Sequence, residues 1–114
     1  MQTPIHISHR EGHLEAVLAT CFDMVIDGVT FQLAVHRSMS GDDWTVTHVV
    51  SGARAVAFAD DQMAAQIAVW GPEHGPAAAG MAAVTALVQR LGASRVRSVM
   101  VGAERFARTG RNYP

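Results

Sequence analysis

The sequence lacks the features that would place it in several large classes of protein. Cys21 is the only cysteine among 114 residues, so no disulfide can form within the chain and its stability must come from packing. No apolar run approaches the roughly 20 residues that cross a bilayer as a helix. The N-terminus has no basic region followed by a long apolar stretch, as a secretion signal would. We therefore expect a cytoplasmic protein without membrane contact.

Lysine is absent as well, because all nine basic residues are arginine. Arginine together with abundant alanine is typical of GC-rich bacterial or phage genomes. Residues 1–76 hold three arginines against nine acids, a net charge of −6, whereas residues 77–114 hold six arginines and one acid, a net charge of +5. This asymmetry indicates either a surface for nucleic acid or an acidic partner, or two halves that face each other within one chain or across a dimer.

The length and composition predict one folded domain over residues 1–114, with a polar tail over 109–114. Hydrophobic residues make up 49% of the chain and charged residues 17%, which fits a globule with one hydrophobic core.

Hydrophobic periodicity predicts an α+β fold. A capping box from Ser8 to Glu11 precedes apolar residues at helical spacing, which predicts a first helix over 9–22. Period-two alternation predicts three strands, over 29–36, 44–50 and 54–59. Helical spacing resumes over 60–70 and 76–91, with a break between the two segments and a stop at Gly92.

After Gly92, valines alternate with arginines, which predicts a fourth strand over 95–101, followed by a short helix over 103–108. The expected order is therefore α-β-β-β-α-α-β, with a mixed, mostly antiparallel sheet and helices on one face. The second hairpin needs a three-residue or bulged turn, because a strict two-residue loop would place Val56 and Phe58 on the face opposite Trp44 and Val46.

Histidines are the first candidates for chemistry. His9 and His13 are four apart on the expected first helix, so they would share one face and could hold a transition metal. His48 shares the inward face of its strand with Trp44 and is expected to be a hydrogen-bonded core residue. His36 faces the other way, beside Thr45 of the next strand, and is expected to be exposed.

Nucleophilic catalysis finds little support in the sequence. Cys21 lies on the apolar stripe of the expected first helix, where a thiol behaves as a small apolar group. No serine has a nucleophile-elbow pattern and no glycine-rich phosphate loop is present. We predict no catalytic residues and no cofactor.

The C-terminal arginines are the second candidate site. Arginine suits phosphate because its planar fork bonds bidentately and stays charged. The set that would bind a partner or nucleic acid is Arg95, Arg97, Arg105, Arg108 and Arg111. The same arginines could instead pair with the acidic half of the chain.

The α-β-β-β-α part of the expected order resembles the double-stranded RNA-binding domain in topology. That family has a basic stretch at the start of its last helix, where this chain has Pro76-Ala77-Ala78-Ala79-Gly80. The resemblance implies RNA binding, and this departure removes the residues that would grip phosphate.

The alanine-rich side of the 76–91 helix allows close approach of another element. It is either a homodimer interface, which we prefer because a small core benefits from further burial, or a second buried side within the domain. The alanines are Ala78, Ala79, Ala82, Ala83 and Ala86.

The absence of a convergent catalytic set favours a non-enzymatic binding or regulatory protein that acts through a protein–protein surface as a homodimer. In size and composition it is similar to accessory and inhibitor proteins of phages and plasmids, including anti-CRISPR proteins. The two alternatives are a nucleic-acid-binding protein that uses the arginines and a small metal-dependent enzyme that uses the N-terminal histidines.

Overall fold

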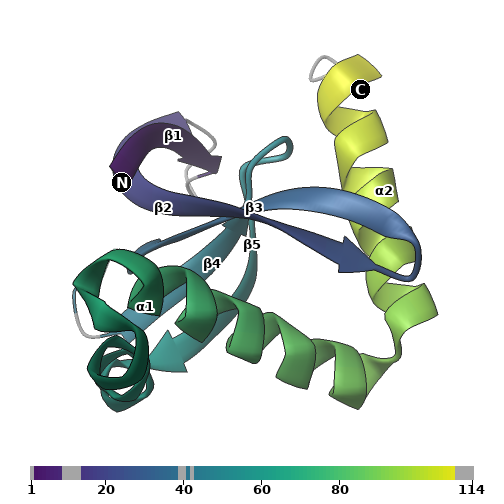
Figure 1. The fold of residues 1–114 in the computed structure, drawn as a ribbon. Coiled ribbons are helices and arrows are strands. Elements are labelled where there is room, and N and C mark those ends of the chain that lie inside the picture. Colours follow the sequence, from purple (N-terminus) through teal and green to yellow (C-terminus); the bar gives the residue numbers. More distant parts are fainter. Residues whose placement is uncertain (1, 9–13, 39–40, 42, 110–114) are drawn as a thin grey trace.

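The computed structural model describes residues 2–8, 14–38, 41 and 43–109 (Figure 1). It is a single α+β domain in which five strands are followed by two helices, so the fold class is confirmed and the expected element order is wrong. The elements are β1 (Gln2–Ser8), β2 (Leu14–Ile26), β3 (Val29–Arg37), β4 (Asp43–His48), β5 (Ala53–Ala59), α1 (Asp60–Leu91) and α2 (Ala93–Thr109).

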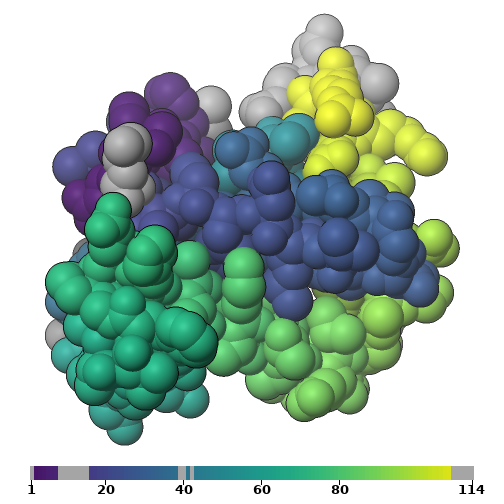
Figure 2. Space-filling model, viewed as in Figure 1, coloured from purple at the N-terminus to yellow at the C-terminus, as the bar shows by residue number. Residues whose placement is uncertain are grey.

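The strands form one sheet in the order β1-β2-β3-β4-β5, and every neighbouring pair is antiparallel. The sheet is therefore a simple meander and not the mixed sheet that the sequence predicted. It curls so far that β1 contacts β5, the strand at the opposite edge. Figure 2 shows β2 and β3 lying across the molecule between α1 below and α2 at the right.

The helix expected over 9–22 is wrong, because the described part of that segment belongs to β2. Phe22 and Ile26 pack toward the helices, while Ala19 packs in a second cluster with Ile5 and Ile7 of β1. The strand therefore buries one face near Ala19 and the other face at Phe22 and Ile26, so its apolar residues do not alternate throughout and also satisfy helical spacing. Ser8 of the expected capping box is the last residue of β1, and Glu11 lies outside the described residues.

The strand expected over 95–101 is also wrong, because this segment is the first half of α2. The helix expected over 103–108 is confirmed as part of α2. Val96 and Met100 are the buried residues of α2, and their spacing of four places them on one side of a helix. With this element order, the topological resemblance to the double-stranded RNA-binding domain no longer holds.

The predicted interruption of the helix after Trp70 is confirmed, and it is limited to one residue, Gly71. Gly71 has φ of 86° and ψ of 166°, a conformation that favours glycine, and divides α1 into two helical segments. The second segment begins at Pro72, directly after the break, and not at Pro76 as expected. Pro72 fits this position because proline is tolerated in the first turn of a helix. Gly92, with φ of 95°, ends α1 as predicted.

The second hairpin has the register that the alternation predicted. Val46 pairs with Val56 and Trp44 with Phe58, so the four side chains share one face. The turn leaves four residues, 49–52, between the paired His48 and Ala53, and a bulge between Val46 and Thr47 restores the register.

Both helices cover one face of the sheet, as expected. Phe31, Leu33 and Val46 of the sheet form one buried cluster with Val84 of α1 and Met100 of α2. Within the described residues, no helix is both long and apolar enough to span a bilayer.

At Gly80 the backbone of α1 lies very close to the sheet. A Cβ atom added there would lie 2.8 Å from Phe22 Cε1 and even closer to Val35 Cγ2. Only glycine therefore lets α1 lie at this depth on the sheet.

Replacing Gly80 by alanine should lower the free energy of unfolding by about 1–3 kcal/mol, because the new methyl group overpacks the core. The measurement is urea denaturation followed by circular dichroism. Gly102→Ala in α2 is the matched control, since nothing lies within 4 Å of its added Cβ. That change should stabilise the helix by roughly 0.5–1 kcal/mol, and equal effects at the two glycines would contradict the close packing at Gly80.

Candidate functional site

An apolar groove lies where the β4–β5 turn, the end of α1 and α2 meet. It has a volume of about 180 Å³, and its apolar lining includes Leu87, Leu91, Val99 and Met100. Leu91 and Val99 remain 44% and 66% exposed, so apolar surface continues from the groove onto the outside of the molecule. Such a contiguous exposed patch marks a site of interaction more often than a scattered surface residue does.

Two helices bring these apolar side chains together. Leu87 and Leu91 are four residues apart on the last turns of α1, so both point to the same side. Gly92 then redirects the chain, and α2 places Val96 and Met100 in the core while Val99 stays at the groove. Leu91 is half exposed because it lies on the last turn of α1, beyond the buried cluster.

Two arginines border the groove. Arg54 comes from β5 and Arg95 from the first turn of α2, and both are exposed. Neither forms an ion pair with any residue that the structure describes. The groove therefore combines an apolar interior with unneutralised positive charge at its border.

His48 lies at the inner end of the groove and is only 2% exposed. Its Nε2 is 2.8 Å from Oε2 of Glu104 on α2, and its Nδ1 is 2.8 Å from the Ser51 hydroxyl oxygen in the β4–β5 turn. In the neutral ring Nε2–H donates to the carboxylate, which can only accept, and Nδ1 accepts from the hydroxyl. The prediction of a hydrogen-bonded core histidine is confirmed.

An imidazole between a serine hydroxyl and a carboxylate is also the set of groups that serine hydrolases use. Such enzymes need backbone N–H groups next to the nucleophile to stabilise the oxyanion. Here the N–H of Gly52 donates to the His48 carbonyl oxygen at 2.8 Å, and the N–H of Ala53 donates to Ser51 Oγ at 3.2 Å. Both donors that follow Ser51 are therefore occupied in closing the turn, and the network fastens the turn to α2.

We expect Ser51 not to react with a fluorophosphonate probe, because this turn offers no oxyanion donor. The measurement is intact-mass spectrometry of the purified protein after incubation with the probe. A single adduct that maps to Ser51 and disappears in Ser51→Ala would show that the network is catalytic.

Replacing Glu104 by alanine should lower the free energy of unfolding by about 1–3 kcal/mol, because it leaves the buried His48 ring without its partner. Glu104→Gln should cost less, since the amide oxygen can still accept from Nε2–H. Denaturant unfolding measures both. Asp23→Ala is the control, because that carboxylate is exposed on β2, and an equal loss in the control would contradict a specific role for Glu104.

The structure divides the C-terminal arginine set. Around α2, Arg97, Arg105 and Arg108 lie within about 80° of one another, whereas Arg95 is about 160° from Arg97. Arg97 Nε is 3.3 Å from a carboxylate oxygen of Asp27, and Arg108 is 3.7 Å from Glu104. Arg97 therefore pairs with the acidic half of the chain, which was one of the alternatives drawn from the sequence. Arg108 instead pairs within α2.

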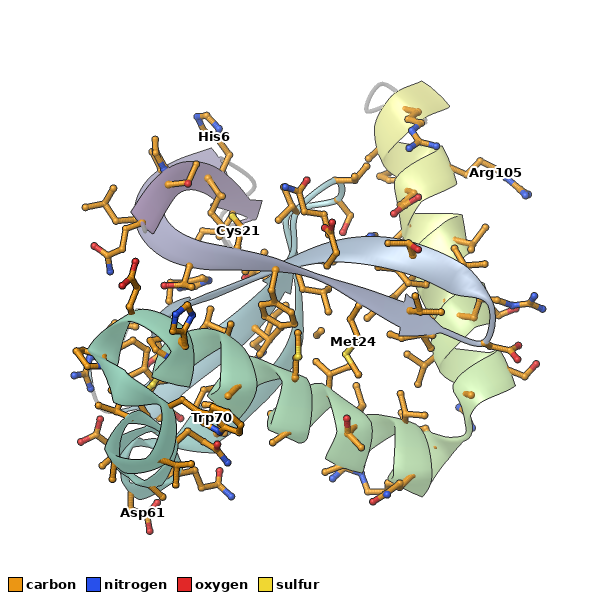
Figure 3. All side chains as sticks on the ribbon, viewed as in Figure 1. His6, Cys21, Met24, Asp61, Trp70 and Arg105 are labelled. Carbon is orange, nitrogen blue, oxygen red and sulfur yellow. The ribbon has the colours of Figure 1, made fainter. Side chains whose placement is uncertain are left out.

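Arg105 points away from the body of the domain in Figure 3. Arg111 lies outside the described residues. Of the arginines that the structure describes, Arg97 and Arg105 line one hollow beside Val29 and Val101, whereas Arg95 lies at the groove on the other side of α2.

The expectation of an exposed His36 is wrong. His36 is paired with Thr45 as predicted, but it is buried, and its Nε2 is 2.7 Å from the Thr47 hydroxyl oxygen. The curl of the sheet explains this burial, because β1 approaches β5 and encloses the sheet face that lies away from the helices.

The proposed metal ligands His9 and His13 lie outside the described residues. Among the residues that are described, no group of three histidine, cysteine, aspartate or glutamate side chains is placed to hold a metal ion. His6 is exposed on β1, and Cys21 is partly buried on β2 (Figure 3). Burial, and secondarily the nearby Asp23 carboxylate, raises the pKa of the Cys21 thiol above its usual value, which disfavours the reactive thiolate.

The alanine-rich side of α1 is only partly buried in the domain. Gln62, Ala65 and Gln66 of the first segment line a hollow together with alanines of the second segment. Ala79 is buried there, whereas Ala82 and Ala86 are exposed, so this side packs within the domain at one alanine and is open at two others.

Comparison of the chain with protein-family models, with curated proteins and with solved structures finds no match.

Proposed function

We propose that this chain is a binding protein that acts through a protein–protein surface centred on the groove between β5 and the two helices. The observation that carries the proposal is the continuity of the groove with the exposed side chains of Leu91 and Val99. A central pocket surrounded by exposed apolar residues is the usual arrangement of a protein-binding hot spot.

The size of the groove favours a protein partner over a small molecule. Its 180 Å³ is below the roughly 300–1,000 Å³ of pockets that enclose a drug-sized ligand. It is close to the roughly 150 Å³ cavity that holds a benzene molecule. One apolar side chain of a partner would therefore fill the groove, while the residues next to it cover Leu91 and Val99.

The border of the groove indicates the charge of the partner. Arg54 and Arg95 carry positive charge that no described residue of the chain neutralises. Complementary charge at the edge of an interface speeds association and excludes partners of the wrong sign. The partner that fits is a protein segment that presents an apolar side chain next to an acidic one, and a regulator or inhibitor would act by occupying such a segment.

Crosslinking from Val99 tests this function. In cells that make the protein, photoreactive benzoylphenylalanine at Val99 should yield a covalent adduct with another protein, and the same group at Val25 should not. Val25 of β2 is the matched control, since it is 64% exposed against 66% for Val99 but lies away from the groove.

The captured protein is then purified and titrated against the wild type and the variants. Val99→Asp should weaken its binding at least tenfold, about 1.4 kcal/mol, whereas Val25→Asp should leave it unchanged. Equal crosslinking at both positions, recovery of small molecules only, or binding that Val99→Asp does not weaken would refute the proposed surface.

A further inference from the structure

A second exposed apolar patch lies at the break in α1, just before Gly71. Val69 and Trp70 end the first segment of the helix and are 71% and 58% exposed. Tryptophan is among the residues that contribute most to protein interfaces, because it removes a large apolar surface from water. In Figure 3 Trp70 lies on the left of the molecule, and most of the length of α1 separates it from α2 at the right.

This patch has an acidic neighbour. Glu73 follows Trp70 by three residues, so their Cα atoms are at most about 11 Å apart. Glu73 is exposed and forms no ion pair with any residue that the structure describes. We call Val69, Trp70 and Glu73 the acidic apolar end of the domain.

The acidic apolar end complements the groove in polarity and in charge. Its apolar side chains match the apolar interior of the groove, and its unpaired Glu73 carboxylate matches the two unpaired guanidinium groups of Arg54 and Arg95.

The two surfaces cannot meet within one molecule. The second segment of α1, residues 72–91, separates them, and 20 helical residues span roughly 30 Å. A groove at one end and its complement at the other can be joined only between two copies, in a head-to-tail contact that uses different surfaces on each.

We propose that the acidic apolar end of one copy occupies the groove of a second copy, with Trp70 as the inserted side chain and Glu73 beside Arg54 and Arg95. This inference rests on the proposed function of the groove as a protein-binding site. Self-association of this kind covers the groove in the free protein, so an external partner must displace a copy of the chain.

Complementation between variants tests the contact. Analytical ultracentrifugation of the wild type at increasing concentration should show species of at least twice the 12.2 kDa of the monomer. Trp70→Ala, which alters the inserted side chain, and the double variant Arg54→Glu/Arg95→Glu, which alters the groove, should each associate at least tenfold more weakly. Val69→Asp is a second variant of the acidic apolar end at the more exposed position, should Trp70→Ala disturb the fold.

Mixing the two defective proteins gives the decisive result. The groove of the Trp70→Ala variant and the acidic apolar end of the arginine double variant are both intact, so a 1:1 mixture should form one heterodimer and nothing larger. Arg90→Glu is the control, since it makes the same kind of substitution, Arg→Glu, at one exposed residue that does not line the groove, and it should associate as the wild type does.

A wild type that stays monomeric at every concentration would overturn the inference, and so would a mixture that does not associate. Association that survives both sets of substitutions would show that copies meet elsewhere. None of these results affects an external protein that crosslinks at Val99, so the two proposals can fail separately.

Discussion

The position of α1 depends on its contact with the sheet at Gly80. Because this residue has no side chain, the helix lies directly against Val35 and Phe22, closer than a Cβ atom would allow. From this point the helix continues for three turns to Leu91, beyond the buried cluster. The exposed apolar residues at its end are therefore a consequence of where the helix is held, and the groove exists because α2 turns back beside them at Gly92.

A second contact holds the other wall of the groove. His48 on β4 and Glu104 on α2 are 56 residues apart in sequence and 2.8 Å apart in space, and the imidazole is almost completely buried. A buried polar pair of this kind is costly to break because either partner would be left unsatisfied. It fixes α2 relative to the β4–β5 turn, and with it the separation of Arg95 and Arg54.

The sequence correctly predicted the elements whose hydrophobic periodicity fits only a helix or only a strand. The three strands from Val29 to Ala59 alternate clearly because apolar residues face the helices and polar residues such as Thr45 and Thr47 face the other way, and α1 is bounded by Asp60 and Gly92. It failed at β2, because that strand buries one face at Ala19 and the other at Phe22 and Ile26, which breaks the alternation, and at α2, because valines between arginines alternate as they would in a strand. The partner of His48 was beyond prediction, since nothing local connects it to Glu104.

The wrong assignment of α2 as a strand also gave a wrong grouping of the arginines on its surface. On a strand, Arg95 and Arg97 would share one face, but on a helix they point in nearly opposite directions. Arg97 then reaches Asp27 of the β2–β3 turn, while Arg95 joins Arg54 at the groove, where no described acid reaches it. Part of the charge asymmetry is thus satisfied within the domain, and part of what remains lies at the groove and at Glu73, at opposite ends of the second segment of α1. Unpaired charges of opposite sign, each beside exposed apolar surface, lower their free energy when two such ends meet.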